Sequence, residues 1–197
     1  ESMSSPPYEE VYHFSKVVIF ITFIFEFLGA VVLSLYWMRD FPIEHAVYLG
    51  IFHSVSAFCT AGFSLFSDNL SAYRDSIVIN VIIGMLCIVG SVGFFVIYDV
   101  YNMVSRKKRE DETPKKLLTH TKLVLIMLPI LIIVGALSLY ISEWNTPFHS
   151  FKDRFLTSTF QAISASTTTG FNTLDTGTVK TLGLTTMIML MYIGASP

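Results

Sequence analysis

Charged residues are scarce in this 197-residue chain, and that scarcity excludes an ordinary soluble domain. Only 14% of the residues are Asp, Glu, Lys or Arg, whereas a soluble domain carries about 25%. Hydrophobic residues make up 52% of the chain, and the mean hydropathy is +0.59. The composition therefore predicts a membrane protein.

Residues for covalent or metal chemistry are also few. The two cysteines, Cys59 and Cys87, provide no disulfide framework, and the five histidines do not have the i, i+4 spacing of metal ligands. No nucleophile–base pair is recognisable, so we expect no enzyme and no covalent cofactor. A secretory signal is not evident either. Because the chain opens with Glu1 and ends inside an apolar run, we interpret it as a piece of a longer polypeptide.

Four long apolar stretches and two shorter ones are present. The long stretches, each predicted to be a span or part of one, are residues 17–35, 77–104, 117–141 and 179–193. The shorter ones, residues 44–58 and 148–165, are too short and polar to cross a bilayer and favour re-entrant helices. The predicted order is span, re-entrant loop, span, linker, span, re-entrant loop, span.

Basic residues are concentrated in one place. Seven of the 13 Lys and Arg fall within residues 106–122, and we expect the charged linker 106–116 to be cytoplasmic by the positive-inside rule. Both re-entrant segments then enter the membrane from the outside. Glu26, inside the first span, is a functional candidate, although a structural partner would also explain it.

A nine-residue motif occurs twice, once after each re-entrant helix. Residues 56–64 (SAFCTAGFS) and 164–172 (SASTTTGFN) are 108 positions apart and share five identities. A short polar segment centred on glycine, which tolerates positive φ, is typical of a narrow pore lined by backbone carbonyls. Neither copy contains a charged residue, which argues against an anion pore or a carboxylate ring.

These motifs carry a family resemblance. Residues 53–67 and 160–173 resemble the second and third pore loops of the Trk/Ktr/HKT superfamily of potassium transporters. Residues 88–94 are similar to the glycine-containing second span of its repeat two, and residues 191–197 to the broken span of its repeat three. The chain as a whole most resembles the bacterial Ktr membrane subunit, the pore-forming component.

The resemblance implies an all-α membrane protein made of repeated span–pore loop–span units, part of a four-repeat pseudo-tetrameric cation pore. The implied divisions are a cytoplasmic lead-in (1–16), one repeat (17–104), a cytoplasmic basic linker (105–116) and a truncated repeat (117–197). The implied selectivity-filter positions are Thr60, Ala61, Gly62, Phe63, Thr168, Thr169, Gly170 and Phe171. The implied gate below the filter comprises Gly194, Ala195, Ser196 and Pro197.

The same resemblance implies uptake of potassium, with sodium as a second candidate ion, through the plasma (inner) membrane. It implies a homodimer bound to an octameric cytosolic ring of nucleotide-binding regulatory subunits, with lipid around the spans; no nucleic acid partner is expected. The alternatives are a sodium-coupled secondary carrier of another small cation, with a site between broken helices, and a sodium-selective member of the superfamily. A membrane-embedded enzyme and a structural scaffold are two further classes.

Overall fold

The computed structural model describes residues 7–105, 117–142 and 151–194, which contain helices and no strand. The linker 106–116 and the gate positions Ala195, Ser196 and Pro197 lie outside the described residues. The helices are α1 (Pro7–Trp37), α2 (Ile43–Phe58), the 3-10 turn η1 (Ser71–Tyr73), α3 (Ile77–Ser91), α4 (Phe94–Ser105), α5 (Thr119–Ser142), α6 (Phe151–Ser166), the 3-10 turn η2 (Thr176–Thr178) and α7 (Thr181–Gly194).

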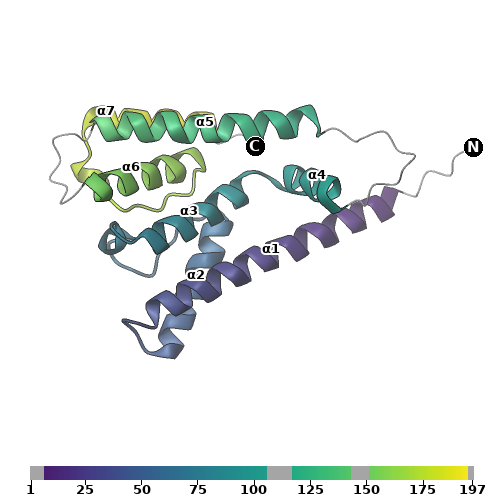
Figure 1. Ribbon diagram of the computed structural model, residues 1–197, viewed down its shortest axis with the longest axis horizontal. Helices are drawn as coiled ribbons and strands as arrows, with labels where there is room; N and C mark the ends of the chain where they lie inside the picture. Colours follow the sequence, from purple (N-terminus) through teal and green to yellow (C-terminus); the bar gives the residue numbers. More distant parts are fainter. Residues whose placement is uncertain (1–6, 106–116, 143–150, 195–197) are drawn as a thin grey trace, which may run out of the picture.

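The helices form two units that follow the sequence repeat. In the first unit, α2 packs mainly on α1 and then on α3. In the second unit, α6 packs mainly on α5, and α7 contacts both. Figure 1 shows the second unit lying along the first, with α6 on the side of α3. Each unit therefore has a long helix, a short packed helix and a third helix.

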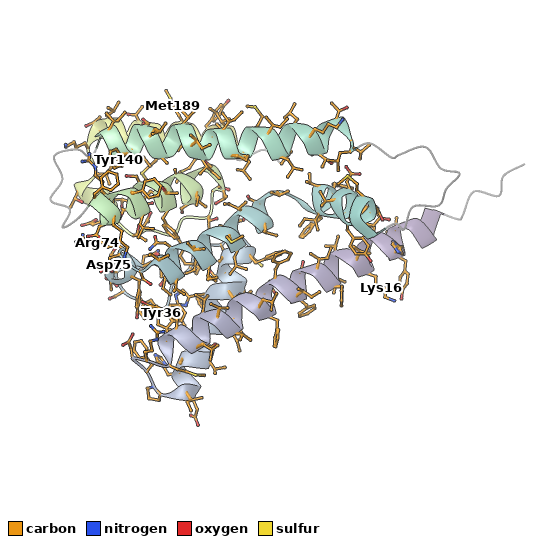
Figure 2. All side chains as sticks on the ribbon, in the orientation of Figure 1. Lys16, Tyr36, Arg74, Asp75, Tyr140 and Met189 are labelled. Carbon is orange, nitrogen blue, oxygen red and sulfur yellow. The ribbon has the colours of Figure 1, made fainter. Side chains whose placement is uncertain are left out.

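Two helices are long and apolar enough to cross a membrane, within residues 11–37 and 119–142. Only 11% of the most apolar part of α5 is buried inside the molecule, so its side chains need apolar surroundings from elsewhere. Figure 2 shows Met189 of α7 pointing away from the protein on the same outer face, and this side chain is 61% exposed. These surfaces are suited to lipid or to further helices.

The apolar stretch 77–104, expected to form one span, is divided. Helix α3 ends at Ser91, α4 begins at Phe94, and the two axes differ by 93°. Gly93 at the break has a φ of +88°, a conformation that strongly favours glycine and turns the chain out of the helix. Pro129, in contrast, lies inside α5, which is assigned as one helix on both sides of it.

Polar residues fix the connection that leads into α3. Ser76 precedes the helix, and its Oγ accepts a hydrogen bond from the Ile79 N–H at 3.4 Å. The Asn80 side-chain amide donates to the carbonyls of Tyr73, Arg74 and Ser76 at 2.7–3.2 Å.

Figure 2 shows Arg74 and Asp75 at the end of the molecule that also carries Tyr140, while Lys16 lies at the opposite end.

Candidate functional site

The two motif copies adopt the same backbone turn, directly after α2 and α6. We call residues 59–63 the first turn segment and residues 167–171 the second turn segment. Thr60 and Thr168 have φ values of +50° and +54°. Gly62 and Gly170, two residues further on, have φ values of +68° and +91°. Each segment thus alternates left-handed positions in the same order, and the threonines adopt a conformation that costs a non-glycine residue about 1–2 kcal/mol.

Main-chain hydrogen bonds hold both turns in the same way. In each copy, three successive N–H groups donate back to carbonyls of the preceding helix, and the donors and acceptors occupy equivalent positions of the motif. In the first copy the bonds are Cys59 to Val55 (2.9 Å), Thr60 to Ala57 (3.1 Å) and Ala61 to Ser56 (2.8 Å). In the second copy they are Thr167 to Ile163 (2.9 Å), Thr168 to Ala165 (3.1 Å) and Thr169 to Ser164 (3.0 Å).

The two turn segments lie against each other. A Cβ added at Gly62 would overlap the Thr169 carbonyl oxygen, so the backbones approach at a distance that only glycine permits. Nearby, the Leu70 N–H donates to the Asn172 carbonyl at 3.0 Å, and the Asn172 N–H donates to Asn69 Oδ1 at 3.1 Å. No local pattern in the sequence identifies the partner of Asn69 across the repeat.

One buried polar side chain in each of α2 and α6 contacts a residue that follows the turn. His53 in α2 contacts the Leu49 carbonyl through Nδ1 (2.8 Å) and Ser64 Oγ through Nε2 (3.1 Å). Its counterpart in the second copy is Gln161 of α6. With the amide oriented to satisfy both groups, its oxygen accepts from the N–H groups of Thr173 (3.1 Å) and Leu174 (3.2 Å). Different side chains thus perform the same supporting role.

Glycines in the following helices pack closely against the carboxyl ends of α2 and α6. A Cβ at Gly90 would overlap the Phe58 carbonyl oxygen, and one at Gly194 would overlap the Ser166 carbonyl oxygen. Phe58 and Ser166 are equivalent positions, because they are the last residues of α2 and α6. No pattern in the sequence identifies a main-chain carbonyl as the partner of Gly90. Of the four predicted gate residues, Gly194 is the one within the described residues.

The predicted site residues are therefore brought together, with one clear difference between the copies. The aromatic ring of Phe171 is fully buried and lies 6.3 Å from the His53 ring, whereas Phe63 is 70% exposed. Beyond the turns, residues of the following loops line a polar hollow that includes Ser67, Asn69, Asn172 and Thr173. Within the described ranges, no three His, Cys, Asp or Glu side chains are placed to hold a metal ion.

An all-helical chain with long apolar helices and a duplicated uncharged turn is a multi-pass membrane protein, and this class agrees with the comparison to known families. Residues 3–197 match the TrkH family, described as cation transport proteins, and the chain belongs to that family. The family is one of transporters, not enzymes, and its members of the Ktr type support residence in the plasma membrane.

Three relatives show the extent of the similarity. The chain is 32% identical to "Ktr system potassium uptake protein B" of Bacillus subtilis, over 99% of this chain and 43% of the relative. It is also 32% identical to the protein of the same name from Vibrio alginolyticus, over 91% of this chain and 39% of the relative. It is 30% identical to "Potassium/sodium uptake protein NtpJ" of Enterococcus hirae, over 95% and 41%. The chain thus spans about two fifths of the length of these relatives.

Proposed function

We propose that the full-length protein takes up potassium through a selectivity filter to which the two turn segments contribute. The observation that carries the proposal is the repeated backbone geometry at two uncharged segments that touch each other. Two of the relatives are named potassium uptake proteins, which supports potassium as the ion. Backbone carbonyls replace the water around a dehydrated cation without a fixed charge that would trap it. The residues in this role are Thr60, Ala61, Gly62, Phe63, Thr168, Thr169, Gly170 and Phe171.

The electrostatics of the segments favour a cation. Both segments follow the carboxyl end of a 16-residue helix, where the helix dipole carries partial negative charge. Neither segment contains Lys or Arg, the residues that would attract an anion. Permeation would be passive. Among the described residues, only backbone carbonyls would bind the ion.

The first unit presents a face that indicates a larger ring. In the second unit, Ile163 lies opposite Gly84, and Phe171 is buried beside His53 of the first unit. The corresponding residues of the first unit, Val55 and Phe63, line an open apolar hollow. We therefore assign this hollow to an α3-like helix of a preceding repeat, with a small residue opposite Val55. This arrangement is part of a pseudo-tetrameric pore of four span–pore loop–span repeats.

We further propose that residues 194–197 belong to a gate below the filter. Gly194 contacts the end of α6, as Gly90 contacts the end of α2, and the first unit breaks its span just after Gly90. A break at the equivalent place in the second unit would put an intramembrane loop under the filter. A homodimer controlled by a cytosolic, octameric ring of nucleotide-binding subunits completes the proposal. It rests on the resemblance to Ktr systems.

Sodium is the second candidate ion, because one relative is named for potassium and sodium uptake. A single filter built from carbonyls distinguishes these ions by the number and spacing of its ligands, so members of one family can differ in preference. Competition between potassium and sodium in the same uptake assay decides between the two.

The test is potassium uptake by the full-length protein, with its regulatory subunit, in cells that lack their own uptake systems. We expect the wild type to restore growth at limiting potassium. Gly170→Ser should weaken that rescue and reduce the preference for potassium over sodium by about tenfold, because a side chain at this positive φ is strained. Gly177→Ser, in the exposed 3-10 turn η2, is the matched control and should behave as wild type.

An unchanged ion preference in Gly170→Ser would contradict the filter assignment. Absence of rescue by a well-expressed wild type with its regulatory subunit would contradict potassium uptake itself.

A further inference from the structure

A carboxyl group inside the apolar helix α1 contacts the start of the first turn segment. Glu26 Oε1 lies 3.9 Å from Cys59 Sγ, and the Glu26 carbonyl accepts a hydrogen bond from Ser54 Oγ at 2.7 Å. Cys59 follows Phe58, the last residue of α2, and directly precedes the left-handed Thr60. Glu26 is thus joined twice to the carboxyl-terminal end of α2, once through its side chain and once through its backbone.

The second unit has no carboxyl group at the corresponding place. Gly29 of α1 faces Ser54, and Gly135 of α5 faces Ala162, the counterpart of Ser54, so the two glycines correspond. The residue three positions before each glycine is Glu26 in α1 and Ile132 in α5. The contact from the first helix to the turn therefore differs between the units.

In the second turn segment, a threonine hydroxyl group makes the hydrogen bonds that hold the turn. Thr167 takes the place of Cys59, and its Oγ1 donates to the Ile163 carbonyl at 2.8 Å and lies 2.7 Å from Thr169 Oγ1. In the first copy, the counterpart of Thr169 is Ala61, which has no side-chain donor or acceptor. A thiol is a weak donor, so Cys59 alone cannot replace this network. The second turn is fastened from within its own unit by threonines, and the first is held from α1.

We propose that Glu26 is a positioning residue for the first turn segment: its carboxylate accepts a hydrogen bond from the Cys59 thiol and holds the turn against α1. This inference rests on the proposed function of the segment as a filter. An intramembrane carboxyl group is costly, which favours a functional reason for its presence. The loss of this contact would let the carbonyls of residues 59–63 move relative to the second turn segment.

The experiment replaces the carboxylate that holds the first turn segment with the hydroxyl group that holds the second. It uses the full-length protein reconstituted into liposomes. Glu26→Ile copies the second unit, and Glu26→Gln keeps an acceptor oxygen of the same reach. The third variant, Glu26→Ile with Cys59→Thr, removes the carboxylate and adds a hydroxyl group at the position that corresponds to Thr167. The ratio of potassium to sodium uptake is measured for each, beside Cys59→Thr alone and Glu44→Gln, an exposed acidic residue at the other end of α2.

We expect Glu26→Ile to lower the ratio about tenfold, Glu26→Gln to stay within about twofold of wild type, and the added Cys59→Thr to restore most of the loss. Glu44→Gln should match wild type. A wild-type ratio in Glu26→Ile would overturn the proposal. So would a loss that Gln shares and that Cys59→Thr does not restore, since that pattern is general damage to the fold.

Thermal unfolding of the same purified proteins separates this proposal from the proposed function. If the wild type transports no potassium, the filter assignment fails, but a non-additive effect of Glu26→Ile and Cys59→Thr on the melting temperature would still establish the contact. Additive effects on the melting temperature would overturn the contact as well.

Discussion

The two turn segments share their backbone but not the side chains that support it. Both have left-handed threonines and glycines at the same positions and the same three main-chain hydrogen bonds. Their supports differ, because His53 stands where the second copy has Gln161, and Cys59 with Glu26 stands where the second copy has Thr167. The comparison teaches that the duplicated feature is a backbone conformation, for which several sets of side chains suffice.

The strongest way to break this equivalence is to compare alanine at the two glycines. Gly62→Ala would combine a strained φ with overlap on the Thr169 carbonyl, at a cost of about 2–5 kcal/mol. Gly170→Ala carries only the strain, about 1–2 kcal/mol, because an added Cβ meets no atom within 4 Å among the described residues. We expect potassium uptake to be abolished in the first variant and reduced in the second, with cell-surface amounts measured alongside. Equal uptake in both variants would contradict the contact between the segments.

A second comparison concerns two glycines on α3. Gly90→Ala would push a Cβ into the Phe58 carbonyl, a backbone group that cannot move alone, and should destabilise the protein by about 1–3 kcal/mol. At Gly84, the added Cβ would lie 3.3 Å from the flexible tip of Ile163, so Gly84→Ala should change stability by less than about 0.5 kcal/mol. Melting temperatures of the purified full-length proteins would show the difference. A larger drop in melting temperature for Gly84→Ala than for Gly90→Ala would contradict the prediction that the contact at Gly90 is the tighter one.

The smallest expected effect on ion transport comes from exchanging the supporting side chains. His53→Gln would keep one hydrogen-bonding group but lose the ring between Phe66 and Phe171, at a cost of about 1–2 kcal/mol. The ion preference should stay near that of wild type, because the main-chain bonds of the turn remain. Melting temperature and the potassium-to-sodium ratio, measured together, test this separation. A large change in the ratio without a change in melting temperature would show that His53 acts on the ion path directly.

The sequence was sufficient for the main organisation of the molecule. The repeated motif predicted two equivalent segments, which are observed as the two turn segments, and the short apolar stretches before them predicted helices that are observed as α2 and α6. Family membership was also anticipated, and the match to the TrkH family confirms it. These features depend on local composition and glycine chemistry, which a single sequence displays directly.

Other features depended on contacts that no local pattern encodes. The break between α3 and α4 was missed because the residues on both sides are apolar, and only the positive φ of Gly93 redirects the chain. The pairing of Asn69 with Asn172 joins residues 103 positions apart. The role of Glu26 was left open, since a carboxyl group in a span has no visible partner until α2 is placed against it. The ion assignment of the eight filter residues remains a prediction.

The close contact of Gly62 with the Thr169 carbonyl has a consequence for the order of events during synthesis. The first turn segment leaves the ribosome before its neighbour exists, because the carbonyl that it meets belongs to the following repeat. At about 5–20 residues per second, the first unit waits roughly 5–20 s for that partner. During this interval the first turn segment has its own hydrogen bonds, but the second turn segment that it contacts is absent. The contact between the two turn segments therefore forms at a late stage of biogenesis, when the second unit packs against the first.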